Sequence, residues 1–257
     1  DGTIIGTKRQ LLEVMKVLEE NTLRGLHPNW SKSLVWSPLP NADFSGLPDV
    51  FPTQARPGIP LLGTAIGDRM AVAAQAMKRV VKVERMVEAL ELLDDAHLQY
   101  VLLKSCAGYP RLNFLLRVAC PDSIAEATEH FDGVMYDTIS ALFSMYDLTA
   151  TDMERIHFPT SLSGFGLTMA RHAAHPAFIG SRFHSLPLQS RILRVPEEDL
   201  QASYVHLIQS FNEYRPQDQQ LLTSDLLASH EPQQLLSSVW MKTQVDKYIQ
   251  SRPTPRE

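Results

Sequence analysis

The apolar pattern between Met70 and Leu93 constrains the fold of this chain more than any other feature. Its apolar residues recur every three or four positions, which is the spacing of one face of an α-helix. The stripe consists of Val72, Ala76, Val80, Val83, Val87, Leu90 and Leu93. A stripe of this length needs an apolar partner surface, because most helical stability in proteins comes from packing. We therefore expect a long helix within a helical bundle.

Helical patterns continue along the chain. Asp94 and Asp95 can begin a second helix, and Asp122 or Ser123 can cap a later one, because their side chains accept hydrogen bonds from free backbone N–H groups. Residues 69–146 are therefore expected to be a helical bundle. Residues 147–257 are expected to form a further helical region with a polar tail.

The first 68 residues predict a different structure. Short apolar segments at Thr3–Ile5 and Ser33–Trp36 are expected to be strands on either side of a helix that Thr7 can cap. Residues 37–57 carry five prolines and predict a loop. The stretch from 58 to 68 predicts a hairpin whose two strands meet at Gly63, since glycine tolerates tight bends. The fold class is therefore α+β and predominantly α.

Composition narrows the setting of the protein. At 257 residues the chain is long enough for two compact units. It has no apolar run of about 20 residues, so we expect no membrane-spanning segment. The two cysteines, Cys106 and Cys120, cannot build a disulfide framework, and we expect both to pack within helices. These features favour an intracellular protein, either cytoplasmic or nuclear.

The charge is uneven along the chain. The net charge of −5 counts against strong nucleic-acid binding, because contacts with phosphates dominate such affinity. Residues 69–117 nevertheless hold eight basic and five acidic side chains, whereas residues 118–180 hold two basic and eight acidic ones. This asymmetry fits a protein that contacts a phosphate backbone on one side only, and equally fits one that contacts none.

Three segments occur in an order that resembles a known family. They are DGTIIG at 1–6, the turn GLHPNWSKS at 25–33, and the hairpin LLGTAIG at 61–67. Together they resemble the second half of the palm of a retroelement reverse transcriptase of the non-LTR type. In that family a Tyr-x-Asp-Asp motif is followed by a strand, a helix, a lysine-bearing turn and a hairpin called the primer grip.

The resemblance extends over roughly the first two thirds of the chain. Matching residues are Leu116-Arg117, Phe131-Asp132 and the turn PTSLSGFGL at 159–167, where Ser163 replaces a glycine usual in the family. The resemblance implies that residues 1–68 are the C-terminal half of a palm, including strand, helix, strand and primer-grip hairpin. Residues 69–146 would be a helical thumb-like region, and residues 147–257 a helical C-terminal region.

The resemblance also implies roles for individual residues. Asp1 would be a remnant of the metal site, and Lys32 would approach the leaving pyrophosphate, where a cation offsets developing charge. Leu62, Gly63 and Thr64 would form the primer grip. The alternatives are a solvated turn lysine and an ordinary hairpin rim. The intact family uses Mg²⁺, but one aspartate cannot assemble a two-metal site, so we expect no cofactor and no polymerase activity from this chain alone.

A basic helix face is the last candidate. Lys78, Lys82 and Arg85 share one face of the long helix, with Arg79 beside them. They could lie along the backbone of an RNA/DNA primer–template, or they could form a solvated face without a ligand. Two functions therefore remain open: a truncated reverse-transcriptase-like protein with weak primer–template binding, whose missing half a second polypeptide could supply, or a non-enzymatic helical interaction protein.

Overall fold

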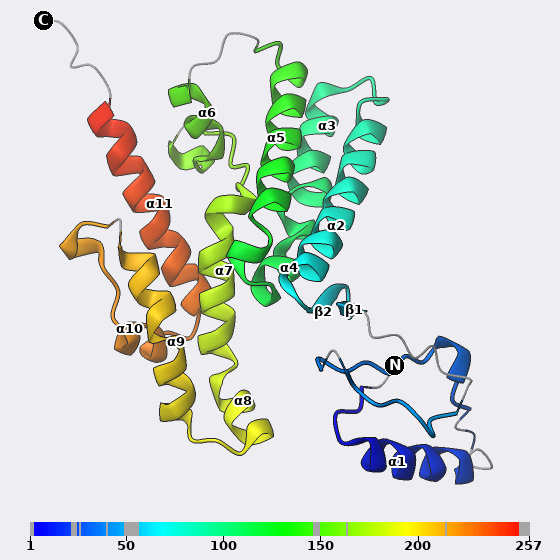
Figure 1. Cartoon of the computed structure of the whole chain (residues 1–257). Helices are drawn as coiled ribbons and strands as arrows, with labels where there is room; N and C mark the ends of the chain where they lie inside the picture. Colours follow the sequence, from blue (N-terminus) through cyan, green and yellow to red (C-terminus); the bar gives the residue numbers. More distant parts are fainter. Residues whose placement is uncertain are drawn as a thin grey trace, which may run out of the picture. The chain divides into compact units, whose positions relative to one another are not determined.

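The structure is a computed structural model that describes residues 3–21, 25, 27–39, 41–48, 57–145, 150–162, 164–213 and 215–251 (Figure 1). It is predominantly helical and contains a two-stranded sheet, which confirms the expected fold class. The chain divides into two compact units. The first consists of Asp1–Leu61 and Ala65–Ala71, and the second of Leu62–Thr64 and Val72–Glu257.

The first unit contains helix α1 (Lys8–Glu20), whose start is defined locally. The Thr7 side chain accepts a hydrogen bond from the backbone N–H of Gln10, and the Gln10 side chain accepts one from the backbone N–H of Thr7. This reciprocal arrangement is a capping box. It confirms Thr7 as the helix cap.

The predicted hairpin is present. Strand β1 (Gly58–Leu61) pairs with strand β2 (Thr64–Gly67), and Leu62 and Gly63 form the connection. Gly67 has φ +148°, and a Cβ there would lie 2.3 Å from both the Pro57 carbonyl oxygen and the Gly58 Cα. A side chain at this end of the hairpin would therefore push the two strands apart.

The two strands expected around α1 are not formed. Thr3–Ile5 has no regular strand structure, and Ser33–Trp36 contributes only an isolated bridge at Val35. A strand needs a neighbour for its backbone hydrogen bonds. Across the described ranges, the sheet contains β1 and β2 alone. The strand–helix–strand half of a palm is thus corrected to a single helix, and Ile5 is 95% exposed rather than packed on a sheet.

The second unit is helical apart from its share of the hairpin. Its elements are α2 (Arg69–Leu90), which begins in the first unit, α3 (Ala96–Leu102), a π-helical turn (Leu103–Ala107), α4 (Asn113–Val118), α5 (Ala125–Leu142), α6 (Ala150–His157), α7 (Ala170–His184), α8 (Leu186–Leu193), α9 (Glu197–Asn212), α10 (Thr223–Ala228) and α11 (Pro232–Ser251).

The long apolar stripe forms the buried face of α2. Ala76, Val80, Val83 and Val87 are all buried, as predicted. The helix ends at Leu90, three residues before the end of the pattern. The apolar periodicity thus predicted both the helix and the face that it buries.

In the second unit, the predicted cap of α3 is confirmed and the predicted cap of α5 is not. The Asp95 side chain accepts a hydrogen bond from the Leu98 backbone N–H at 2.9 Å, so it caps α3 as predicted. The predicted caps at Asp122 and Ser123 are wrong. Both residues lie in a 3₁₀ turn, and α5 begins after Ile124 without a side-chain cap.

Helix α7 lies at the centre of the second unit (Figure 1) and joins two apolar cores. Its first half, including Ala170 and Ala177, belongs to a core shared with α2, α4 and α5. Its second half, including Ile179 and Phe183, belongs to a core shared with α9, α10 and α11. Helix α7 thus packs against helices on both sides of residue 146 in the sequence. The three predicted domain ranges, 1–68, 69–146 and 147–257, stay predictions.

Two further findings concern composition. Cys106 and Cys120 are exposed, so the expectation that both thiols pack within helices is wrong. Cys106 lies in the π-helical turn, and Cys120 directly precedes the 3₁₀ turn at Pro121.

Over the part of the chain that the structure describes, no helix is both long enough and apolar enough to cross a membrane.

Candidate nucleic-acid interface

The hairpin tip, Leu62–Thr64, has a defined backbone geometry. Leu62 has φ +47° and Gly63 has φ +87°, so two successive residues adopt the left-handed conformation. This is the pattern of a type I′ turn, whose twist matches that of the two flanking strands. The Leu62 side chain is 75% exposed, whereas Thr64 is buried. The tip therefore presents one apolar side chain and bare glycine backbone at its surface.

Arg79 connects the hairpin tip to α2. Its Nε donates a hydrogen bond to the Gly63 carbonyl oxygen at 2.7 Å. A Cβ at position 63 would lie 2.0 Å from Arg79 Nη2, so a larger residue there would force the guanidinium to move. Arg79 was predicted as a nucleic-acid contact. The geometry gives it a positioning role, because its half-buried side chain holds the turn against the helix.

The other predicted basic residues of α2 form an exposed row. This basic row, Lys78, Lys82 and Arg85, lies on the opposite side of the helix from the buried stripe. Within the described ranges, none of the three forms an ion pair. The nearby Glu84 side chain lies 3.6 Å from His130 Nε2 instead. The row thus presents three cations to solvent beside the residue that holds the hairpin tip.

Two predicted site residues remain, Lys32 and Asp1. Lys32 is exposed in a 3₁₀ turn, Trp30–Lys32, that Asn29 caps, and it belongs to the first unit. Asp1, the predicted remnant of the metal site, lies outside the described residues.

The described residues do not fit a magnesium site. A two-metal centre needs several carboxylates that converge on the ions. In the described part of the chain, no group of three His, Cys, Asp or Glu side chains is placed to hold a metal ion. No reaction step can therefore be derived through Mg²⁺ from these residues.

One of the motif segments, Phe131-Asp132, contacts the start of α7 inside the second unit. The Asp132 carboxylate accepts hydrogen bonds from the backbone N–H groups of Ala170 at 2.6 Å and Arg171 at 3.1 Å. It therefore caps α7. Burial is the main cause that raises the pKa of Asp132 to about 6, while the two backbone N–H groups and Arg171 lower it. The role that the structure gives Asp132 is to anchor α7 to α5.

Sequence reasoning did not find this role for Asp132, although a signal was present. Asp132 lies next to Phe131 and three residues before Met135, so it falls on the apolar face of its own helix. A carboxylate on such a face must find partners when it is buried. That argument predicts a capped or paired aspartate, but it does not name the partner helix.

The buried His157 of α6 packs against the partly buried His172 of α7. His157 Nδ1 is 2.9 Å from the Leu167 carbonyl oxygen, and its ring meets that of His172 edge-on with the centroids 6.4 Å apart. Burial is the main cause that lowers the pKa of each imidazole to about 4. Both rings are therefore neutral at neutral pH.

Comparison with known proteins adds no evidence about this interface. No protein-family model matches the chain, and neither characterised proteins nor solved structures give a significant match.

Proposed function

We propose that this chain is the downstream part of a reverse transcriptase of the retroelement type, and that the hairpin tip and the basic row bind the backbone of an RNA/DNA primer–template. The observation that carries the proposal is the hydrogen bond between Arg79 and Gly63. It attaches the turn that resembles a primer grip to the helix that carries three exposed, unpaired cations.

The proposed contact is electrostatic. From Lys78 to Arg85 the helix rises about 10 Å, so three long side chains can reach neighbouring phosphates of one strand. Such contacts position a nucleic acid but do not read its sequence. Catalysis is not assigned to this chain by itself, because two-metal phosphoryl transfer needs several converging carboxylates. We expect no Mg²⁺-dependent primer extension by the purified chain.

Fluorescence anisotropy with a labelled RNA/DNA primer–template tests the binding. Three phosphate contacts predict that the logarithm of the affinity falls against the logarithm of salt concentration with a slope of about −2.7. Affinity should thus drop roughly 40-fold when the salt rises about fourfold. The triple variant Lys78→Gln/Lys82→Gln/Arg85→Gln should bind at least about tenfold more weakly at low salt and show a nearly flat slope.

A matched control removes the same charge from another surface. The triple variant Arg191→Gln/Arg194→Gln/Lys247→Gln alters exposed residues of α8, its end and α11. It should retain the wild-type affinity and slope. Absence of binding by the wild-type chain at low salt would contradict the proposal, and so would an equal loss in both triple variants.

A second candidate function has one observation in its favour. Helix α8 exposes three apolar side chains, Leu188, Ile192 and Leu193. Exposed apolar residues that cluster on one short helix are typical of a surface that contacts another protein. If the primer–template does not bind, a non-enzymatic helical interaction protein becomes the better description.

A further inference from the structure

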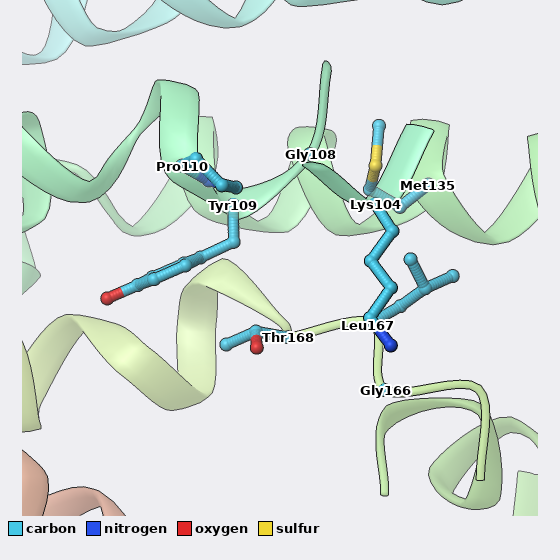
Figure 2. Close-up of a pocket in the computed structure, with 8 residues that line it drawn as sticks. All are labelled: Lys104, Gly108, Tyr109, Pro110, Met135, Gly166, Leu167 and Thr168. Carbon is cyan, nitrogen blue, oxygen red and sulfur yellow. The ribbon is translucent and has the colours of Figure 1, made fainter. Parts of the chain in front are cut away.

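A small pocket lies in the second unit, where the turn at 159–167 meets the π-helical turn. Its volume is about 200 Å³. Its lining residues are Lys104, Gly108, Tyr109, Pro110, Met135, Gly166, Leu167 and Thr168. Figure 2 shows the Lys104 side chain extending toward Gly166 and Leu167, with the Tyr109 ring and Thr168 on another side. The proposed nucleic-acid surface uses none of these residues.

The chemistry of the pocket is divided between one cation and apolar walls. Met135 and Leu167 are buried, and Pro110 and the Tyr109 ring add further apolar surface. Lys104 Nζ lies 3.4 Å from the Phe165 carbonyl oxygen, and no carboxylate of the described residues lies within ion-pair distance of it. An ammonium group has three N–H donors. Most of its capacity to donate is therefore open to a ligand.

The backbone around Lys104 is shaped to place this cation. Lys104 lies in the π-helical turn Leu103–Ala107, and such turns occur frequently at functional sites. Gly166 has φ +67°, and a Cβ there would lie 2.7 Å from Lys104 Nζ. Residues with a Cβ rarely adopt this left-handed conformation, and a Cβ here would also displace the Lys104 ammonium group from its observed position.

Aromatic residues hold the same loop beside Lys104, whose Nζ lies 5.9 Å from the centroid of the Tyr100 ring. The Tyr100 hydroxyl donates a hydrogen bond to the Phe165 carbonyl oxygen. The rings of Tyr100, Phe143 and Phe165 contact one another, with centroids 5.1 to 6.2 Å apart. These contacts anchor Phe165, the neighbour of Gly166, without a ligand, and such pre-organisation reduces the ordering cost of binding.

We propose that this pocket binds a small carboxylate with an apolar body. The carboxylate would accept hydrogen bonds from Lys104 Nζ, and the body would lie against Tyr109, Met135 and Leu167. A charge-assisted hydrogen bond combined with apolar burial discriminates such a ligand from its neutral analogue. The proposal is independent of nucleic-acid binding, which involves other residues.

Benzoate titrated into the full chain and followed by calorimetry and ligand-observed NMR tests the site. We expect saturable binding of benzoate, and binding of neutral benzamide that is weaker by about tenfold or more. The variant Lys104→Met keeps the apolar stem but removes the charge, so it should lower the benzoate affinity by a similar factor. The exposed control variant Lys242→Met should bind as the wild type does.

The proposal would be overturned if the wild-type chain showed no saturable benzoate binding, or if the wild type and Lys104→Met bound benzoate with equal affinity. Circular dichroism of each variant confirms that its helices are intact. Lys104→Gln, which keeps a polar end without charge, provides a second test and should bind benzoate as weakly as Lys104→Met. Equal benzoate and benzamide affinities in the wild type would also exclude a carboxylate site.

Discussion

Replacing Gly180 with alanine is expected to destabilise the second unit by about 2 kcal/mol. Gly180 lies in α7 and packs against the start of α11. A Cβ there would lie 2.5 Å from the Gln233 Cα and 2.6 Å from its backbone nitrogen. These are backbone atoms, so no change of rotamer can relieve the overlap and α11 must move. The gain in helix propensity, about 1 kcal/mol, offsets only part of this cost.

Gly133 offers a matched control within the same unit. It lies in α5, is exposed, and a Cβ there meets no atom within 4 Å. Gly133→Ala should therefore stabilise the protein by as much as about 1 kcal/mol, because alanine has the higher helix propensity. Urea unfolding of both variants, followed by circular dichroism, compares the two. Stabilisation of equal size in both would show that α7 and α11 are not in close backbone contact.

Acid is expected to weaken the fold through His157. Its pKa is about 4 in the folded protein, lowered mainly by burial and also by Arg171, against an ordinary value of 6.5. The unfolded chain therefore binds a proton between pH 6.5 and 4 that the folded protein does not bind. Stability is fully present above pH 6.5 and falls as the pH drops toward 4, by about 3 kcal/mol for this residue. His172, also with a pKa of about 4, acts in the same direction.

Asp132 is expected to act in the opposite direction. Its pKa is about 6 in the folded protein against 3.8 ordinarily, with burial the main cause and Glu129 a minor one. Its contribution to stability is fully present below pH 3.8 and is lost as the pH rises through 6. Acidification from pH 6 to 4 thus recovers part of what the histidines lose.

Two variants separate these opposing effects. His157→Gln should flatten the dependence of the free energy of unfolding on pH between 7.5 and 4.5 (about 3 kcal/mol less loss), and Asp132→Asn should steepen it. The exposed His184 supplies the control variant, His184→Gln, whose dependence should match that of the wild type. Urea unfolding at several pH values measures each slope. A wild-type slope retained in His157→Gln would contradict the assignment.

The local elements of this protein could be predicted because each depends on neighbours in the sequence. The buried face of α2 follows from apolar residues spaced three and four apart, which a helix places on one side. The Thr7 capping box involves residues only three positions apart. The hairpin at Gly63 follows from the need for a left-handed backbone in a tight turn.

The features that failed prediction depend on distant partners. Thr3–Ile5 has the composition of a strand, but a strand forms only where a second one supplies backbone hydrogen bonds. Local preference was thus outweighed by the surrounding structure. Asp122 and Ser123 failed for a local reason instead: both lie within the 3₁₀ turn Pro121–Ser123, and α5 begins only after Ile124.

The sequence by itself determined that this is a mainly helical protein with a basic α2 and a glycine hairpin, because periodicity and turn chemistry are local properties. Only the tertiary structure decided which side chains work together. Arg79 meets Gly63 across 16 residues, Asp132 meets α7 across 38, and Lys104 meets Phe165 across 61. The physical reason is that burial and shape bring such groups together, and no spacing in the sequence encodes those distances.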